Sequence, residues 1–268
     1  MGTSVAKNTL HEWTKYNVSR PTTVSADVEG ADTTFADLTA PSRVNNITQI
    51  IKQPVRVSRT ERAVNVVATG DPYAWQKSDA LRMLKMKMEY AILNAVKASG
   101  SSGVARQMDG IDAFITTLAT ARNSGTSFSE TELNDMAADA YTNVRADKIF
   151  DILLCTIKIK QAINGFSGNS TRYIDASDRR LTKDILVYDS AVGSHKIMHH
   201  RDVRNSSGTT TVYGLREDML QVAYLDKPVF EELAKTGDSD KGHWVTEFTL
   251  EVLEEKALQK RTGYNLNG

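Results

Sequence analysis

A single stretch of 28 residues, from Asp71 to Ala98, places the strongest constraint on how this chain folds. Asp71 is a residue type that caps helix N-termini, and the Pro72 that follows it is favoured at the first helical position. Apolar residues then recur three and four positions apart along one face: Leu81, Leu84, Met88, Ile92 and Ala95. The sequence therefore predicts one long amphipathic helix, which at 1.5 Å per residue would span about 40 Å.

The length of this predicted helix leaves two roles open. It exceeds what the core of a compact domain needs, which favours a strut between distant parts of the molecule. The same pattern fits an ordinary helix packed on a domain core. Five further residues widen its apolar face: Met83, Met86, Tyr90, Leu93 and Val96. Six charged residues indicate that part of the helix meets water: Lys77, Arg82, Lys85, Lys87, Glu89 and Lys97.

The charges of the 268 residues balance. Lys plus Arg and Asp plus Glu both total 33, so the formal net charge is zero. A chain without a net basic field lacks the electrostatic attraction on which dedicated DNA-binding proteins depend. Copies of a neutral protein repel one another little at long range, which is compatible with self-association.

The cysteine count and the hydropathy pattern bear on where the protein folds. Cys155 is the single cysteine and lies in the apolar run 152–157, so we expect a buried, inert thiol and folding in the reducing cytosol. No run of 18 apolar residues occurs, and Met1–Leu10 has no hydrophobic signal-peptide centre. The sequence predicts a soluble protein that is not exported by the usual route.

Residues 1–40 are rich in Ser, Thr, Ala and Asp and show no sustained period. Their aromatic residues, Trp13, Tyr16 and Phe35, are isolated from one another. Such a segment buries little by itself, so it is either a disordered tail or an arm that becomes ordered against another surface. Because an exposed Trp13 is unfavourable in water, we expect an arm whose aromatic residues act as anchors.

Residues 41–70 carry the alternation that is typical of extended strands. Val55 and Val57, and later Val64 and Val66, alternate with polar or small residues. This predicts a two-stranded β-hairpin ahead of the long helix. Two strands alone are marginally stable and expose their edges, so the hairpin either finds contacts on a partner or lies on a sheet of its own chain.

The region from about residue 128 to 235 alternates strand and helix patterns. Ser129, followed by Thr131 and Glu132, predicts a helix start. The apolar run near Cys155 predicts a buried strand, and a short helix that ends at Gly165 follows it. This block is therefore expected to be a compact α/β lobe.

The last third of the chain is dominated by strand patterns. The runs 185–189, 194–200 and 209–215 predict antiparallel strands, and a turn is expected at Asp226-Lys227-Pro228. A long strand buried on one face is predicted by alternating residues at Trp244, Thr246, Phe248, Leu250 and Val252. Residues 262–268 are expected to form a frayed end.

Two matches to a catalytic signature fail on their context. Lys235-Thr236-Gly237 matches the third motif of penicillin-recognising serine enzymes, and Ser4-Val5-Ala6-Lys7 matches their Ser-x-x-Lys nucleophile motif. That nucleophile must begin a buried helix, whereas Ser4 lies in a polar tail, and no Ser-Asp-Asn motif lies between the two. We therefore expect no enzyme and assign no catalytic residue.

A metal or cofactor site is not expected either. His195, His199, His200 and Asp202 are residue types that bind metals. Adjacent residues of a strand point to opposite faces, however, so His199 and His200 cannot both bind one ion without a bulge. We therefore expect these histidines to be polar, half-exposed residues of a strand. No glycine-rich phosphate loop is present. The lack of catalytic, metal-binding and phosphate-binding motifs in the sequence favours a structural protein.

Several short sequence blocks follow one another in a fixed order between residues 10 and 263. The early blocks are Glu29-Gly30-Ala31-Asp32, Pro41 to Ile50, Val57-Ser58-Arg59-Thr60, Ala63-Val64 and Gly70, with Gln76 and Glu89 in the predicted helix. The late blocks are Leu233 to Ser239, Glu247 to Val252 and Lys256-Ala257. With the order of arm, ribbon, long helix, α/β lobe and terminal strand, they resemble a short-tailed-phage family of major capsid proteins with the Hong Kong-97-type fold.

The resemblance implies an α+β chain with five parts. These are an N-terminal arm at 1–40, an extended β-hairpin loop at 41–70, a peripheral domain with a spine helix at 71–127, an axial domain at 128–242, and a return strand with the C-terminal tail at 243–268. Many weak repeated contacts would hold such a shell together. The ribbon 46–67 and the arm are expected to be its main intersubunit surfaces, with rim charges at Arg56, Arg59, Glu61 and Arg62.

The implied function is self-assembly into the icosahedral shell that encloses the double-stranded DNA genome of a tailed bacteriophage. The implied partners are other copies in hexamers and pentamers, portal, scaffolding or decoration proteins, and packaged DNA bound without sequence specificity on the inner face, with no membrane. The implied location is the virion, after synthesis in the host bacterial cytoplasm. Two other readings stay open at this point: a phage tail or sheath protein, and a hydrolase around Lys235.

Overall fold

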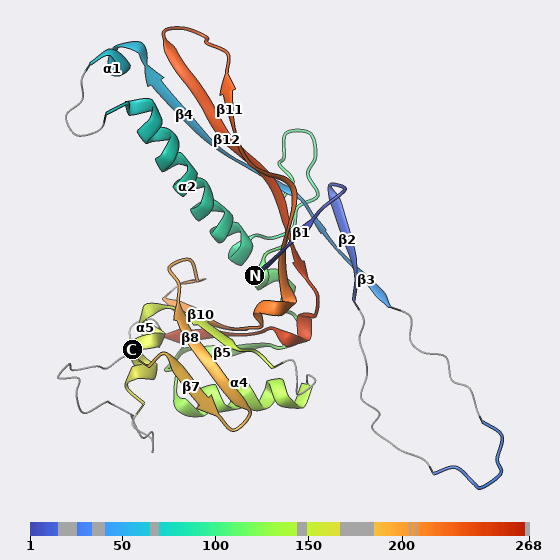
Figure 1. The fold of residues 1–268 in the computed structure, drawn as a ribbon. Helices are drawn as coiled ribbons and strands as arrows, with labels where there is room; N and C mark the ends of the chain where they lie inside the picture. Colours follow the sequence, from blue (N-terminus) through green and yellow to red (C-terminus); the bar gives the residue numbers. More distant parts are fainter. Residues whose placement is uncertain are drawn as a thin grey trace, which may run out of the picture.

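The computed structural model describes residues 1–15, 26–33, 41–64, 70–143, 149–166, 185–203, 205–206 and 208–265. In this part of the chain the strands form a four-stranded sheet, a seven-stranded sheet and a two-stranded ribbon. The four-stranded sheet extends as a long blade beside one helix, and the seven-stranded sheet forms a separate lobe below it (Figure 1). The α+β class expected from the sequence is confirmed.

The blade is built around a long antiparallel pair, β11 (Leu220–Leu233) and β12 (Ser239–Val252). β4 (Gln49–Ser58) pairs antiparallel with the outer side of β12, and β1 (Gly2–Val5) pairs parallel with β11 at its base. The predicted terminal strand is confirmed, and its alternating apolar residues Phe248, Leu250 and Val252 are buried. Its observed start at Ser239 places the expected domain boundary at 242 inside the strand.

The predicted hairpin within 41–70 is wrong. β4 finds its partner nearly 200 residues later, with Gln53 opposite Trp244. The chain then enters a short helix, α1 (Arg59–Ala63), where the turn of the hairpin was expected. The Ser58 hydroxyl accepts a hydrogen bond from the Glu61 amide at 3.2 Å and caps this helix. Alternation specifies a strand but not its partner. Val66 lies outside the described residues.

The long helix is confirmed as α2 (Pro72–Asn94), and the Asp71 carboxylate accepts the Tyr73 amide at 3.0 Å. It ends four residues before Ala98, since Ala95 already has extended backbone. Leu84 and Met88 belong to one buried cluster with Phe248, Leu250 and Val252, with Leu81 and Ile92 packed against it. The helix therefore packs along the blade, as predicted, and its other face is exposed.

The first fifteen residues fold onto their own chain. β2 (Leu10–Lys15) pairs antiparallel with β3 (Ser42–Ile47). The Trp13 ring is buried, and its Nε1 donates to the Val252 carbonyl at 2.8 Å. The expectation that Trp13 anchors an arm on another surface is therefore wrong. Tyr16 and Phe35 lie outside the described residues.

The seven-stranded sheet draws on three separate regions of sequence. Its order is β5 (Ala119–Thr126), β13 (Gln259–Asn265), β10 (Thr209–Leu215), β6 (Ile152–Cys155), β8 (Gly193–His199) and β7 (Val187–Ser190), with β9 (Asn205–Ser206) beside β10. Two helices pack on it: α4 (Glu130–Asn143) and α5 (Ile157–Asn164). The predicted α/β lobe and both of its helices are confirmed.

Two predictions about the C-terminal third are wrong. Residues 262–265 are not a frayed end but part of β13, in which Tyr264 is fully buried. The expected turn at 226–228 is absent because β11 runs through it with shifts of register at Tyr224 and Asp226. β11 lies at the sheet edge beyond its pairing with β1, where Pro228 costs no ladder hydrogen bond.

Short segments connect the two sheets. α3 (Ile111–Phe114) follows the long helix, and two 3-10 turns, η2 (Glu217–Met219) and η3 (Glu255–Ala257), lie where the chain enters and leaves the blade. At Gly110, which precedes α3, a Cβ atom would lie 2.8 Å from the carbonyl oxygens of Ala91 and Ile92. The backbone therefore approaches the end of α2 more closely than any side chain allows.

Candidate intersubunit site

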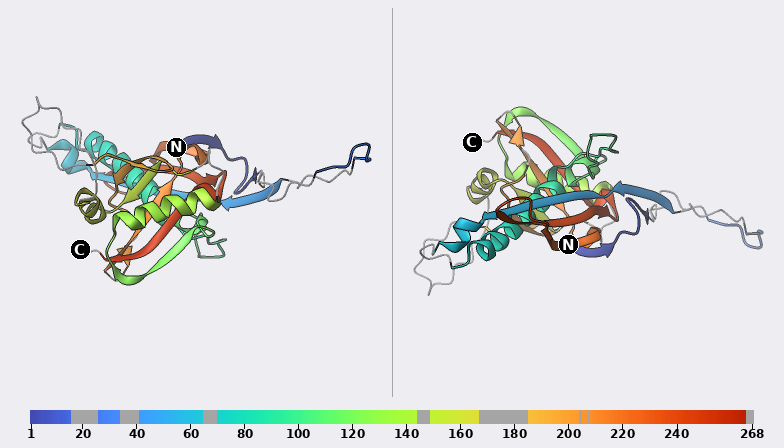
Figure 2. Two further views of the ribbon diagram at one scale, coloured as in Figure 1. Left: turned by 90° about the horizontal axis from the view of Figure 1, so that it is seen from below. Right: turned by 90° about the horizontal axis from the view of Figure 1, so that it is seen from above.

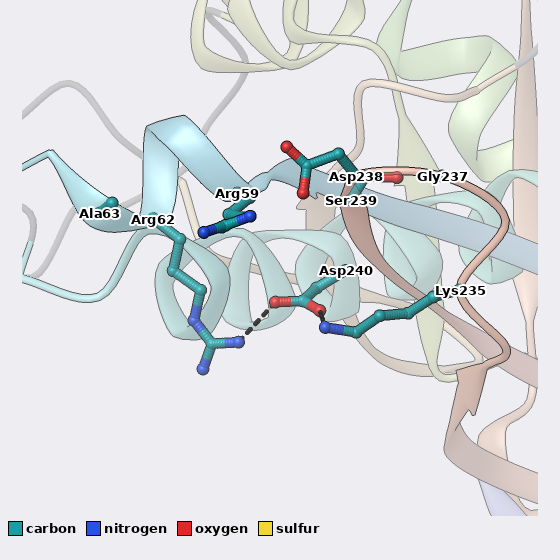
Figure 3. Close-up of a pocket in the computed structure, with 8 residues that line it drawn as sticks. All are labelled: Arg59, Arg62, Ala63, Lys235, Gly237, Asp238, Ser239 and Asp240. Atoms are coloured by element: carbon teal, nitrogen blue, oxygen red, sulfur yellow. Dashed lines mark hydrogen bonds and ion pairs between the residues drawn. The ribbon is translucent and has the colours of Figure 1, made fainter.

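The far end of the blade holds a small charged pocket of about 260 Å³ (Figure 3). Residues from α1, from the connection between β11 and β12, and from the start of β12 line it: Arg59, Arg62, Ala63, Lys235, Gly237, Asp238, Ser239 and Asp240. The pocket thus brings Lys235-Thr236-Gly237 next to the predicted rim residues Arg59 and Arg62. No local sequence pattern links these two groups.

Backbone contacts hold the two sides of the pocket together. The Arg59 amide donates to the Asp238 carbonyl at 3.2 Å, and Ser58 stands opposite Ser239 in the strand register. Gly237 has a φ of +121°, a conformation that favours glycine over any other residue, and it lets the chain turn into β12. The pocket is therefore positioned by the last pairs of the sheet.

Asp240 is the electrostatic centre of the pocket. Its Oδ1 lies 2.5 Å from Lys235 Nζ and its Oδ2 lies 2.5 Å from Arg62 Nη1 (Figure 3). Hydrogen bonds from Lys235 and Arg62, together with their positive charges, lower the pKa of the Asp240 carboxyl. Arg62 also lies 3.9 Å from the Asp71 carboxylate and places its guanidinium 5.6 Å from the centre of the Tyr73 ring. Arg62 thereby ties α1 to both β12 and the start of α2.

Aromatic side chains stiffen the blade next to this pocket. The Phe230 ring packs edge-on against Trp244, with centroids 5.3 Å apart, and against Tyr73 at 6.3 Å. Lys77 Nζ lies 3.9 Å from the Phe230 ring centre, and Trp244 Nε1 donates to the Lys77 carbonyl at 2.9 Å. The blade and the first turns of α2 therefore form one packed unit up to the tip.

The two parts of the penicillin-enzyme signature lie at opposite ends of the blade. Ser4 is in β1, where its hydroxyl donates to Glu251 at 2.7 Å, and β1 pairs with residues 221–224. Lys235 follows β11 at the other end and is paired with Asp240. The geometry offers no nucleophile and base in contact at Lys235 among the described residues.

The buried cysteine expected from the sequence is confirmed. Cys155 is fully buried in β6, and desolvation raises the pKa of its thiol to about 12. A thiol in this setting remains protonated at neutral pH and is a poor nucleophile.

The histidines separate into two environments. His195 is buried, not half-exposed as expected: its Nδ1 lies 2.9 Å from the Phe150 carbonyl, its Nε2 lies 2.8 Å from the Ser190 hydroxyl, and burial lowers its pKa. His200 instead lies near Asp202 and Glu89, whose ligand atoms are within 4.8 Å of one another. Glu89 enters this group from α2, a proximity that no sequence spacing signals. That the protein needs no metal stays a prediction.

A charged network in the lobe was also missed by sequence reasoning. Glu132 of α4 accepts hydrogen bonds from Arg122 at 2.9 Å, Arg261 at 2.8 Å and the Tyr264 hydroxyl at 2.8 Å. Burial opposes ionisation of Glu132, but the hydrogen bonds from Tyr264 and Arg261 and the charge of Arg122 outweigh it, so the pKa of Glu132 is lowered. This network fastens β13 to α4 and β5. It is structural, and no local motif marks it.

Comparisons with known proteins agree with this architecture. The family model described as SU10 major capsid protein matches residues 1–265. No curated protein sequence matches the chain. In the described part of the chain, every helix is too short or too polar to pass through a lipid bilayer.

Solved structures share the fold at low sequence identity. The SrpI encapsulin of Synechococcus elongatus PCC 7942 is 12% identical, with a TM-score of 0.63 over 99% of this chain and 85% of that chain. The capsid of cyanophage P-SCSP1u is 10% identical, with a TM-score of 0.63 over 98% and 86%. Mycobacterium phage Che8 is 14% identical, with a TM-score of 0.61 over 98% and 86%.

The fold of these structures is the Hong Kong-97-type fold predicted from the sequence. The family match extends over almost the whole chain, from β1 to β13. The chain therefore belongs to the SU10 major capsid protein family, and it is a phage major capsid protein that forms the shell of the virion.

Proposed function

We propose that the tip of the blade is a principal contact between neighbouring subunits in the hexamers and pentamers of the shell. The observation that carries the proposal is α1, in which none of the residues Arg59–Ala63 is buried by its own chain. A helix of five residues has little stability of its own in water. Its exposed position at the end of a stiff blade fits contacts with a second copy.

The two sheets supply the domain roles of this proposal. The blade and α2 act as the peripheral domain, whose spine is α2, and the seven-stranded lobe acts as the axial domain around the local symmetry axis. The chain passes between them, so the peripheral domain includes residues 220–252 and the axial domain includes β13. Packaged DNA contacts the inner face without sequence specificity, and the zero formal net charge of the chain keeps that attraction weak.

The remaining roles concern partners and chemistry. We propose that the subunit is made in the host bacterial cytoplasm, where the reduced Cys155 is stable, and that it meets portal, scaffolding or decoration proteins during assembly. We also propose that it has no catalytic activity, which its membership of a capsid protein family supports.

Negative-stain electron microscopy of the purified protein tests the proposed contact. Wild-type protein is expected to form closed shells, and a variant with Arg59→Ala and Arg62→Ala is expected to remain as folded subunits under the same conditions. Wild-type particles with tubular rather than closed geometry contradict the shell arrangement. Normal shells from the variant contradict the role of the tip.

A further inference from the structure

A groove of about 690 Å³ runs between α2 and β4, away from the tip pocket. Its base includes the buried residues Ile51, Ala91 and Ala95. Its walls carry large apolar side chains that remain about half exposed: Ile50, Met86, Tyr90 and Val96. Apolar side chains gathered at this density on a subunit surface mark a contact site.

The charged residues of this groove are mainly basic. Lys52 of β4, Lys87 of α2 and Arg201 line it, and Asp202 is the acidic residue among its lining. Lys87 Nζ makes a long contact of 3.4 Å with the Lys52 carbonyl, which leaves most of its hydrogen-bonding capacity for another partner. The groove therefore suits an occupant that combines an apolar side chain with carboxylates.

Residues 26–33 of the same chain have that chemistry. The Ala31 amide donates to the Val28 carbonyl at 3.0 Å, and Gly30 has a φ of +79°, which defines a tight turn with glycine at its third position. Val28 is 79% exposed on this turn. Three acids flank it, Asp27, Glu29 and Asp32, and the segment contains no Lys or Arg.

The turn does not fill the groove of its own subunit. Residues 26–33 lie at one end of the molecule and α1 at the opposite end (Figures 1 and 2). The groove lies against the C-terminal half of α2 and the first residues of β4, and none of residues 26–33 lines it. All eight residues of the segment are exposed. An apolar side chain on a preformed turn gains burial by contact with another copy.

We propose that the turn at residues 26–33 of one subunit docks in the groove between α2 and β4 of a neighbouring subunit. Val28 enters among Ile50, Met86 and Val96, and the carboxylates of the turn face Lys52, Lys87 and Arg201. The inference rests on the proposed shell arrangement and names the partner surface of its N-terminal segment. A turn that is already formed loses little conformational entropy on docking.

Cysteine crosslinking in assembled particles tests the docking. One variant carries Val28→Cys and Val96→Cys, and its matched control carries Val28→Cys and Val104→Cys. Val96 and Val104 are 57% and 58% exposed, but only Val96 lines the groove. The native Cys155 is buried and does not take part. Mild oxidation is expected to link subunits covalently in the first variant, with a yield at least about fivefold above the control.

The outcomes of the crosslinking separate two failures. Shells of normal appearance without preferential crosslinking at Val96 overturn the docking, while the proposed shell arrangement stands. The wild-type protein's failure to form closed shells overturns the arrangement itself.

A charge exchange tests the electrostatic part independently. Glu29→Lys and Lys87→Glu are each expected to raise the concentration needed for assembly, by about two- to fivefold for each exposed ion pair lost. The variant with both changes has the wild-type net charge and is expected to assemble near the wild-type concentration. The control combines Glu29→Lys with Lys158→Glu, a charge reversal at an exposed position of α5, and is not expected to restore assembly at the wild-type concentration. A combined variant that assembles no better than its worse single change overturns the pairing.

Discussion

Arg62 Nη1 lies 2.5 Å from Asp240 Oδ2, and this contact joins the short helix after β4 to the first residues of β12. The two residues are 178 positions apart in the sequence. The pair holds α1 against the tip of the blade, while the remaining surface of α1 is exposed. A substitution on the exposed surface of the tip is therefore expected to change assembly without unfolding the subunit.

Arg62→Ala is expected to lower particle yield while the subunit keeps its fold. The ion pair is exposed, so its removal has little effect on unfolding, but the same contact recurs in every copy of a shell. Sedimentation of particles at several salt concentrations, with circular dichroism of the subunit, measures both effects. Arg216→Ala is the control away from the tip, and it removes the pair with Asp218 at 2.8 Å together with a bond to the Ile149 carbonyl at 2.9 Å.

A deletion of residues 53–63 would test the same surface less specifically than Arg62→Ala. Val55 and Val57 of β4 are buried, and residues 53–58 pair with 239–244 of β12. Removing them takes a strand out of the blade as well as the tip.

Equal loss of assembly in Arg216→Ala and Arg62→Ala would show that the yield follows surface charge in general and not the tip.

Glu132→Gln is expected to destabilise the seven-stranded lobe by about 1–3 kcal/mol, because Arg261 is almost fully buried and loses part of its charge-assisted bonding. Urea unfolding of the unassembled subunit at neutral pH measures this cost. Asp135→Asn, an exposed change on the same helix, is the control and is expected to stay near wild type.

The same residue predicts a pH dependence. The pKa of Glu132 is lowered in the folded chain, so its contribution is present above the pKa of an unfolded Glu, about 4.3, and is lost as the pH falls through the folded value. The wild-type stability is therefore expected to fall more steeply below pH 4 than that of Glu132→Gln. Parallel curves for the two proteins would remove Glu132 from the acid response.

Gly110→Ala is expected to cost about 1–3 kcal/mol, because the new Cβ would lie 2.8 Å from two backbone oxygens and 2.9 Å from the Ala95 nitrogen at the end of α2. These are backbone atoms, which do not move aside as a flexible side chain does. Thermal unfolding of the unassembled subunit measures the effect, and Ser102→Ala in an exposed loop is the control. A Gly110→Ala protein as stable as this control would contradict the close approach.

Trp13→Phe is expected to cost about 1 kcal/mol by removing the bond from Nε1 to the Val252 carbonyl, and Trp13→Ala about 3–5 kcal/mol by leaving a cavity. Both costs are expected in the unassembled subunit, since Trp13 is buried by its own chain. Denaturant unfolding followed by circular dichroism measures them. If only assembled particles were weakened, the first strands would instead pack on a neighbour.

Local patterns in the sequence predicted those features that depend on residues close together in the chain. The Asp71 cap and the spacing of Leu84 and Met88 define α2, and the alternation of Phe248, Leu250 and Val252 defines β12 with its buried face. The order of these parts, with several short blocks, was sufficient to identify the capsid family.

The features that the sequence missed depend on distant partners. A strand pattern at Val55 and Val57 does not say that β4 pairs with β12, and nothing around Lys235 indicates that Arg62 shares Asp240 with it. Strand β13, which contains Tyr264, was missed because its sequence is mostly polar and shows no apolar alternation. Arg261 of this strand is buried because Glu132 and Asp139 neutralise its charge. Charge satisfaction of that kind is visible only after folding.

The sequence by itself therefore determined the long helix α2 with its buried face, the long strand β12 and the family. Tertiary structure alone decided which strands pair, which charges meet at the tip, and that Trp13 folds inward while Val28 stays exposed. The physical reason is that helix and strand periodicity arise from local backbone geometry, whereas pairing and burial depend on segments up to 247 residues apart.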